Sequence, residues 1–284
     1  MVGFSAVWGS EARQGTGRVT NAIANASART GVDFGYLMGQ AQIESGMNAN
    51  ARARTSSATG LFQFLDQSWL SVMKNHGAEH GMAWASDSIQ QASNGRYYVA
   101  DPAMRQQILD LRKHPETASV MAAEFASDNR AYLEQRTGRP AESVDLYLAH
   151  FLGAAGAAKF LTAASANPGA SGADLFPVAA RANRGVFYDR NGSPRSLADI
   201  RQSFASKLDA SAQSVGADIQ YVGNADQYDL ANVSQVQPAD YVRIEQQRLA
   251  QNQAWSEAAA DEPTFQPQTE AARLAYLMLA TLGR

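Results

Sequence analysis

An apolar segment of the chain ends in Gln42-Ile43-Glu44-Ser45-Gly46, and a loop of small and amide-bearing residues follows in Ser56-Ser57-Ala58-Thr59-Gly60-Leu61-Phe62-Gln63-Phe64. Apolar residues at helical spacing before Glu44 predict a helix that begins after Asp33 as N-cap and stops at Gly46. Glu44 would then lie in the last turn, where the negative end of the helix dipole disfavours an anion. Apolar neighbours such as Met38 and Ile43 would lower the local dielectric. The stretch therefore predicts a carboxyl suited to donate a proton.

The loop that follows fits a cleft that binds sugars. Glycosidic cleavage needs a proton on the leaving oxygen, and Glu44 is the candidate acid. Gly60 lets the backbone approach closely, and the Gln63 amide can donate and accept hydrogen bonds with N-acetyl or hydroxyl groups. Aromatic faces for sugar rings would come from Phe62, Phe64 or Trp69. A Glu before Ser-Gly is also a common helix end, so the first stretch alone fits a purely structural role.

Helical periodicity recurs along the chain and predicts an all-α domain with at most a minimal β-hairpin. Residues 75–99 are irregular and predict a long loop packed on the core. No strand-like alternation persists, and no repeat of solenoid length is present in the sequence. The predicted helices cover residues 13–27, 33–45, 101–113, 117–135, 139–151, 157–164, 175–182 and 197–208, and a short helix is predicted to start at Asp66-Gln67-Ser68-Trp69.

Composition narrows the class of protein. The 284 residues are 45% hydrophobic and 18% charged, which is typical of a soluble globular protein with a core. The formal net charge of −3 gives no basic bias toward nucleic acid, and no apolar run is long enough to span a membrane. The absence of cysteine excludes disulfides and thiolate metal sites.

Three ordered motifs resemble those of the lysozyme-like lytic transglycosylases, the soluble-lytic-transglycosylase domains related to goose-type lysozyme. The motifs are Glu44-Ser45-Gly46, then Gly60-Leu61-Phe62-Gln63-Phe64, then Tyr147-Leu148-Ala149-His150-Phe151-Leu152-Gly153. The form Ser-Ser-Ala-Thr-Gly-Leu-Phe-Gln-Phe is similar to the version in phage endolysins and flagellum-associated muralytic enzymes. The similarity spans roughly residues 17–207.

The resemblance implies a helical, lysozyme-like domain that cleaves peptidoglycan between N-acetylmuramic acid and N-acetylglucosamine. Glu44 matches the single catalytic Glu of the family, which protonates the glycosidic oxygen and then takes the proton from the muramyl C6 hydroxyl as a 1,6-anhydro ring closes. No second carboxylate, metal or cofactor is implied. Ser45 and Gln63 match positions that contact the acid or the sugars, and Phe62 belongs to the same binding motif.

The third motif departs from the commoner Ala-Tyr-Asn-Ala-Gly pattern of the family. In register with Gly153, His150 falls where the family has Tyr, and Phe151 falls where it has Asn. Tyr147 lies one turn earlier on the same side of the helix. Both Tyr147 and His150 are therefore candidates for the residue that reaches Glu44 and the substrate.

A second motif points to different chemistry. His76-Gly77-Ala78-Glu79-His80 matches an inverted zinc-peptidase pattern, in which two His four residues apart on a helix bind zinc and Glu79 serves as base. Gly77 is a poor residue for a helix interior, and no third ligand stands out. A solvated polar turn is the simpler interpretation, and activity that survives chelation would exclude zinc chemistry.

Two further alternatives keep the lysozyme-like fold but change the function. In a hydrolytic lysozyme a second carboxylate, with Asp66 nearest to the loop, would activate water. In a non-catalytic wall-binding or assembly protein the fold would remain without the activity. Product masses separate the first alternative from transglycosylation, and Glu44→Gln separates the second.

The sequence predicts three regions: an N-terminal extension at 1–16, the catalytic domain at 17–207 and a C-terminal extension at 208–284. The extension combines a polar, partly disordered linker with a predicted helix, Thr269 to Leu282. Such a helix usually packs on its own domain, and the alternative is that it docks into a partner's groove. Flagellum-associated relatives suggest a flagellar rod or secretion-apparatus protein as that partner. The substrate, peptidoglycan strands, implies a periplasmic or cell-wall location, although the first eight residues show no signal-peptide pattern.

Overall fold

The computed structural model describes residues 5–219, with side chains described from residue 17 onward. This part of the chain is mainly helical, which confirms the predicted all-α class, and it includes one small two-stranded hairpin. The predicted helix from Thr269 to Leu282 and most of the polar linker lie outside the described residues.

The first half of the described chain contains six α-helices, two 3-10 helices and the hairpin. These elements are α1 (Ser5–Thr30), α2 (Phe34–Ser45), α3 (Asp66–His76), η1 (Gly77–His80), α4 (Ala83–Ser88), β1 (Gln90–Gln91), β2 (Tyr97–Tyr98), α5 (Pro102–Asp110), η2 (Leu111–Lys113) and α6 (Pro115–Thr137). The antiparallel strands pair Gln90 with Tyr98 and Gln91 with Tyr97. The segment that was predicted as a long loop therefore holds short regular elements.

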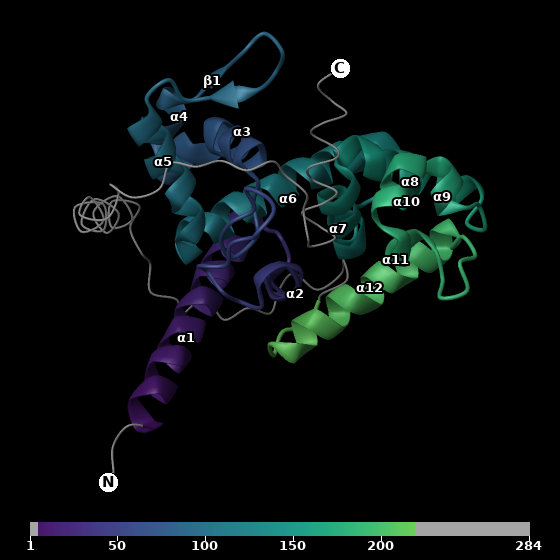
Figure 1. Ribbon diagram of the computed structural model, residues 1–284, viewed down its shortest axis with the longest axis horizontal. Helices are drawn as coiled ribbons and strands as arrows, with labels where there is room; N and C mark the ends of the chain where they lie inside the picture. The colour runs from purple at the N-terminus through teal and green to yellow at the C-terminus, as the bar shows by residue number, and fades with distance from the viewer. Residues whose placement is uncertain (1–4, 220–284) are drawn as a thin grey trace.

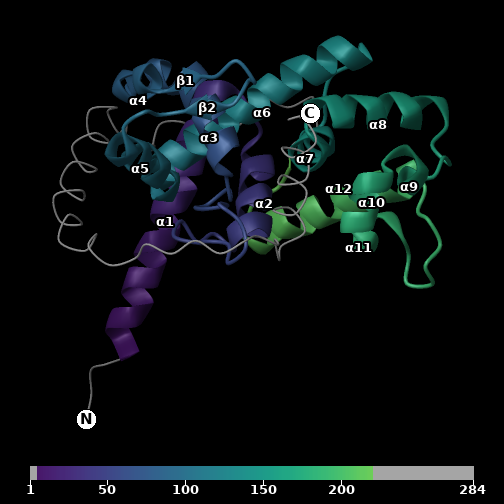
Figure 2. The same ribbon diagram turned by 45° about the horizontal axis from the view of Figure 1, so that its top comes forward.

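The second half of the described chain is entirely helical. Its elements are α7 (Ser143–Leu152), α8 (Ala154–Ala166), α9 (Gly172–Leu175), α10 (Pro177–Ala182), α11 (Arg184–Phe187) and α12 (Leu197–Ser214). Figures 1 and 2 show α1 and α3 to α5 at one end of the described part, α8 to α11 at the other, and α6 running between them.

Two glycines bring α2 unusually close to α12 and the segment after it. A Cβ atom on Gly39 would lie 2.9 Å from the carbonyl oxygen of Leu208, and one on Gly35 would lie 2.2 Å from that of Asp218. Since the glycines are four residues apart, they share one face of α2. This close packing fixes the helix that carries Glu44.

The N-terminus of α7 is fixed by a buried carboxylate. Asp145 is fully buried, and its side chain accepts hydrogen bonds from Arg139, from Arg201 on α12 and from the Glu142 backbone in a capping box. Burial lowers the pKa of Arg201, but the charges and hydrogen bonds of Asp145 and Glu142 outweigh burial and raise it overall. These contacts set how α7 lies against α12.

The first and last described helices run past both boundaries that the sequence suggested. The boundary expected at residue 17 falls inside α1, and the boundary expected at 207 falls inside α12. Leu208, Ala212 and Ala217 belong to the main hydrophobic core, with exposed fractions of 1%, 0% and 4%. Within residues 5–219, no helix has the length and apolar character needed to cross a membrane.

Candidate active site

Helix α2 ends as the sequence predicts and places Glu44 in its last turn. The Asp33 side chain accepts a hydrogen bond from the Tyr36 backbone N–H at 2.7 Å and so caps the start of the helix. Gly46 has φ of 61°, and its N–H donates to the carbonyl of Gln42 at 3.0 Å. Glu44 therefore lies at the negative end of the helix dipole.

The Glu44 side chain is almost completely buried, with 5% of its surface exposed. Its Oε1 atom makes no hydrogen bond within the described part of the chain. Buried polar atoms in proteins are nearly always paired, and those left unpaired are frequent at functional sites. The carboxyl therefore has unused hydrogen-bonding capacity.

His150 of the third motif lies next to Glu44. Its Nε2 atom lies 3.3 Å from Glu44 Oε1, close enough for an ion pair but not aligned as a hydrogen bond. Its Nδ1 atom lies 3.2 Å from Nε2 of Gln40. With the Gln40 amide in this orientation, its nitrogen donates to Nδ1, and in the matching neutral tautomer the proton of the ring is on Nε2, which faces Glu44.

Tyr147 packs against the ring of His150. Its ring stacks on that of His150, with the centroids 6.2 Å apart and the planes at 20°, and meets Phe204 of α12 edge-on at 5.4 Å. Tyr147 is 3% exposed. Phe151, where the family pattern has Asn, packs on the same Phe204 at 4.8 Å. Of the two candidates, His150 lies within ion-pair distance of Glu44, and Tyr147 is buried and stacks on the His150 ring.

Sequence reasoning missed two residues of this site. Tyr36 and Gln40 are 2% and 4% exposed, and they precede Glu44 on α2 at spacings of eight and four residues. Burial raises the pKa of the Tyr36 hydroxyl, and the charge of Glu44 raises it further, so this hydroxyl stays protonated. The recurrence of Tyr36, Gln40 and Glu44 at every fourth position of α2 was the signal that could have found them.

Ser45 has a different role from the one predicted. Its hydroxyl donates to the carbonyl of Ala41 at 3.0 Å and accepts from the backbone N–H of Asn48 at 3.1 Å. The single hydroxyl hydrogen is thereby used at the helix end, so Ser45 does not orient the Glu44 carboxyl by donating to it. A contact with sugars stays a prediction.

The loop of the second motif has the close backbone approach that Gly60 was predicted to allow. Gly60 has φ of 85°, and a Cβ atom there would lie 1.9 Å from the carbonyl oxygen of Arg112. Gln63 adopts φ of 49°, and its amide nitrogen donates to the carbonyls of Ala51 and Gly60 at 3.2 and 2.9 Å. Because both amide hydrogens are used inside the loop, only the side-chain oxygen remains for a ligand.

Arg112, another residue that sequence reasoning missed, holds this loop from η2. Its guanidinium donates to the carbonyls of Ser57 and Phe64 at 2.8 and 2.9 Å and pairs with Asp66 at 2.8 Å. Burial lowers the pKa of Arg112, and the charge of Asp66 partly offsets this. No local pattern in Leu111-Arg112-Lys113 marks the arginine, because its partners are distant in sequence.

The predicted aromatic platform is wrong, because the rings lie in the core. Phe62, Phe64 and Trp69 are 1%, 7% and 0% exposed. Trp69 donates its indole N–H to the carbonyl of Ile108, and Phe64 meets Trp69 edge-on at 5.3 Å. Apolar packing of the loop outweighed the sugar-stacking role, and Phe62 presents no exposed face to a substrate.

Asp66, the candidate base of a hydrolytic mechanism, is engaged by two arginines. Its carboxylate pairs with Arg105 at 2.7 Å and with the buried Arg112 at 2.8 Å. These ion pairs connect the start of α3 to α5 and η2. Asp66 thus has a structural role in the fold.

The segment from His76 to His80 does not form the single helix that zinc binding by both imidazoles would need. His76 is the last residue of α3, and Gly77 begins the 3-10 helix η1. His80 Nε2 pairs with Glu124 of α6 at 2.7 Å, whereas His76 Nε2 pairs with Asp128 at 2.9 Å. The Nε2 atoms of the two imidazoles therefore pair with different carboxylates, and the change of helix type at Gly77 breaks the i, i+4 register that a shared zinc ion would need.

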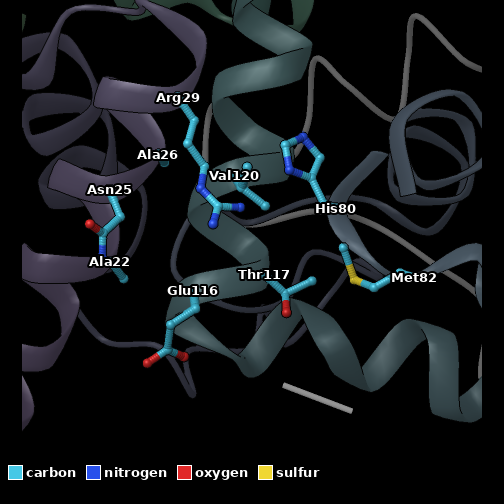
Figure 3. Close-up of a pocket in the computed structure, with 9 residues that line it drawn as sticks. All are labelled: Ala22, Asn25, Ala26, Arg29, His80, Met82, Glu116, Thr117 and Val120. Carbon is cyan, nitrogen blue, oxygen red and sulfur yellow. The ribbon is translucent and has the colours of Figure 1, made fainter. Parts of the chain in front are cut away.

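A small pocket lies elsewhere in the molecule, between α1, α6 and the η1–α4 segment (Figure 3). Polar side chains that line it include Asn25, Arg29, His80, Glu116 and Thr117. None of the site residues predicted from the three motifs lines this pocket. Its location therefore gives no support to a role in chemistry at Glu44.

The structure brings together the first and third motifs, at Glu44 and His150, and orders the second motif through Arg112. No model of a known protein family matches the chain. The functional assignment therefore depends on the site and on the sequence resemblance.

Proposed function

We propose that this protein is a lytic transglycosylase that cleaves the β-1,4 bond between N-acetylmuramic acid and N-acetylglucosamine in peptidoglycan. The observation that carries the proposal is the buried Glu44 carboxyl, whose Oε1 has no hydrogen bond and lies 3.3 Å from His150 Nε2. The order and spacing of the three sequence motifs support it.

The proposed reaction uses Glu44 twice. The neutral carboxyl donates its proton to the glycosidic oxygen as the bond from the muramyl C1 atom to that oxygen breaks. The resulting carboxylate then takes the proton of the muramyl C6 hydroxyl while the C6 oxygen bonds to C1. The product is a 1,6-anhydro sugar, the carboxyl is neutral again, and no water is consumed.

We expect His150 and Gln40 to stabilise Glu44 through the two imidazole nitrogens of His150. With the Gln40 nitrogen on Nδ1, the His150 Nε2–H faces Glu44 and stabilises its ionised form. With the amide reversed, Gln40 Oε1 would accept from Nδ1–H, and Nε2 would present a lone pair to the protonated acid. The Gln40 Oε1 atom is otherwise buried without a hydrogen bond. The two amide orientations thus match the two protonation states that the reaction requires.

The engagement of Asp66 favours transglycosylation over hydrolysis. A hydrolytic mechanism on the inverting plan needs a second carboxylate free to activate water. The Asp66 carboxylate instead pairs with Arg105 and Arg112. The use of the substrate's own C6 hydroxyl removes the need for such a base.

The test is product mass analysis on purified sacculi, with Glu44→Gln as variant and Asp174→Asn, an exposed carboxylate far along the chain, as control. Wild type and control should release 1,6-anhydro muropeptides, and Glu44→Gln should lose activity by at least about a hundredfold. Products heavier by one water with a reducing end contradict transglycosylation. Undiminished activity of Glu44→Gln contradicts the proposed acid.

The substrate would place this activity in the periplasm or cell wall. A flagellar rod or secretion-apparatus protein remains the proposed partner of the segment from Thr269 to Leu282. A chain that lacks residues 263–284 should then keep its activity on sacculi and lose the partner. Equal loss of both contradicts this division of roles.

A further inference from the structure

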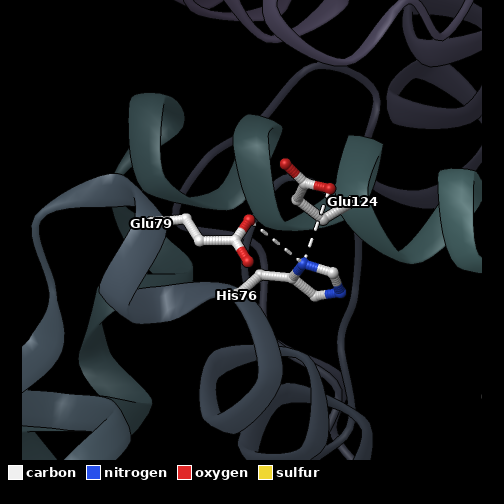
Figure 4. A group of neighbouring side chains, drawn as sticks. All are labelled: His76, Glu79 and Glu124. Atoms are coloured by element: carbon white, nitrogen blue, oxygen red, sulfur yellow. Dashed lines mark ion pairs between the residues drawn. The ribbon is translucent and has the colours of Figure 1, made fainter.

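Three side chains from separate segments meet at the turn between α3 and η1. His76 ends α3, Glu79 lies in η1 and Glu124 lies in α6, and one ligand atom from each lies within 4.8 Å of the other two. Figure 4 shows both carboxylates facing the same ring nitrogen of His76. The Glu79 and Glu124 oxygens lie 3.7 and 3.6 Å from Nδ1.

The His76 Nδ1 atom is buried and has no hydrogen bond within the described residues. At 3.6 and 3.7 Å the two carboxylate oxygens are too far away to serve as hydrogen-bond partners. Zinc–ligand bonds of about 2.0–2.1 Å in a tetrahedral site place the ligand atoms roughly 3.3–3.4 Å apart. The spacing around Nδ1 is thus close to that around a bound ion, and small side-chain movements would complete it.

The surrounding contacts have the form of a second shell around a metal site. Asp128 Oδ2 lies 2.9 Å from the other ring nitrogen of His76, which fixes the ring and leaves the Nδ1 lone pair for a metal. His80 Nε2 lies 2.7 Å from Glu124 Oε1 and so holds the second oxygen of that carboxylate. Both supports are on atoms that do not face the centre of the group.

The local charge favours a cation. Three carboxylates surround the His76 ring, since oxygens of Asp128, Glu124 and Glu79 lie 2.9, 3.6 and 3.7 Å from its nitrogens. The Glu79 side chain is 66% exposed, whereas those of His76 and Glu124 are 17% and 16% exposed. An ion would therefore enter from the side of Glu79, which can close over it.

We propose that His76 Nδ1, Glu79 and Glu124 form a binding site for a divalent transition ion such as Zn²⁺, which joins the α3–η1 turn to α6. An imidazole with two carboxylates suits zinc-like ions better than Mg²⁺ or Ca²⁺, which prefer oxygen ligands alone. Water would take the remaining position. This site differs from the pattern that the sequence suggested, because Glu124 replaces His80 as a ligand and Glu79 is a ligand instead of a base.

The test is titration of the full chain, without affinity tag and after chelator treatment, with Zn²⁺ in a competition assay against a chromophoric chelator. Wild type should bind one equivalent, and Glu79→Gln should weaken binding by at least about tenfold. Glu124→Gln and His76→Ala should abolish it. Asp174→Asn removes the same charge elsewhere and should bind as wild type does.

Thermal unfolding gives a second readout. Zn²⁺ at about 100 times its dissociation constant should raise the Tm of wild type by roughly 5–10 °C. Because Glu79 is exposed, Glu79→Gln should fold normally without zinc and lose most of this rise. No bound equivalent, or binding and Tm shifts that are unchanged in Glu79→Gln and Glu124→Gln, would overturn the proposal.

Discussion

Tyr36, Gln40 and Glu44 form a line of polar side chains along one face of α2, four residues apart. The first two are buried, and the third ends in a carboxyl with an unpaired oxygen. Polar groups are costly inside a helix bundle unless they are paired, so such a line indicates selection for a task other than stability. The single-residue predictions test that interpretation.

Gln40→Leu separates stability from activity. Leucine fills a similar volume and removes the buried Gln40 Oε1, which has no hydrogen bond, so the free energy of unfolding should be unchanged or slightly higher. The loss of the bond to His150 Nδ1 should lower kcat by about 10- to 100-fold with a smaller change in KM. Steady-state assays and thermal unfolding measure the two effects. A parallel loss of stability and activity would assign Gln40 a purely structural role.

Gly60→Ala tests the close approach of the loop to η2. Alanine at φ of 85° is strained by about 1–2 kcal/mol, and its Cβ would collide with the Arg112 carbonyl. Gly95 provides the control, because it has φ of 80° but no atom within 4 Å of the place that a Cβ would take. Denaturant unfolding should show a markedly larger loss for Gly60→Ala than for Gly95→Ala. Equal losses would mean that the loop yields easily.

At this scale the sequence predicted the place of Glu44 but not its surroundings. Asp33 and Gly46 act locally, so their roles as cap and stop were readable from neighbouring residues. Arg112 acts on segments 48 and 55 residues away, and no local pattern reveals such partners. The Phe62 ring was misplaced because an aromatic residue in a loop fits a core as well as a binding face.

Among the elements, α7 is held in place by a buried ion-pair network. It presents His150 near its C-terminus and is fixed at its N-terminus by Asp145, which is fully buried between Arg139 and Arg201. Because the helix is rigid, a substitution of Asp145 should change the position of His150.

Asp145→Asn should therefore lower both stability and activity. Breaking a buried ion pair costs about 3–5 kcal/mol, because the remaining partners lose their counter-charge. Arg139→Met is the matched control, since the Arg139 side chain is 41% exposed and its pair should contribute only about 1 kcal/mol or less. Denaturant unfolding and sacculus assays compare the variants. A smaller effect for Asp145→Asn than for Arg139→Met contradicts the role given to the buried carboxylate.

Long elements were more predictable than short ones, although the six-residue α10 falls within the helix predicted at 175–182. Helix α6 has several turns of apolar periodicity, so its existence and type followed from the sequence. Helices of four to six residues such as α9 and α4 complete less than two turns, and strands of two residues show no alternation at all. Tertiary packing determines these segments.

For the molecule as a whole, the hydrophobic core decides where the folded unit stops. A chain ending at residue 219 should keep the unfolding temperature of the described domain. A chain ending at 207 loses the buried Leu208, which alone should cost about 2–5 kcal/mol, together with Ala212 and Ala217. Thermal unfolding of the two chains measures the difference. Identical unfolding temperatures would place the boundary where the sequence suggested.

Chelation distinguishes the two sites. Glu44 and His150 lie on α2 and α7, whereas the proposed zinc ligands lie on α3, η1 and α6. Chelator treatment should lower the Tm and leave kcat on sacculi unchanged at temperatures well below unfolding. Loss of kcat in parallel with the bound metal, restored by Zn²⁺, would instead connect the metal to the chemistry.

Because the Gly60 loop depends on Arg112, its sequence motif alone does not determine the loop conformation in another protein. The segment from Ser57 to Phe64 takes two of its hydrogen bonds from a guanidinium that the motif itself does not contain. If the loop were grafted into another helical scaffold, it would keep its sequence but lose its conformation unless an equivalent arginine were supplied. The transferable unit is the loop together with η2 and the Asp66 carboxylate that neutralises the arginine. Searches for related chains would gain selectivity by requiring that distant arginine as well as the local motif.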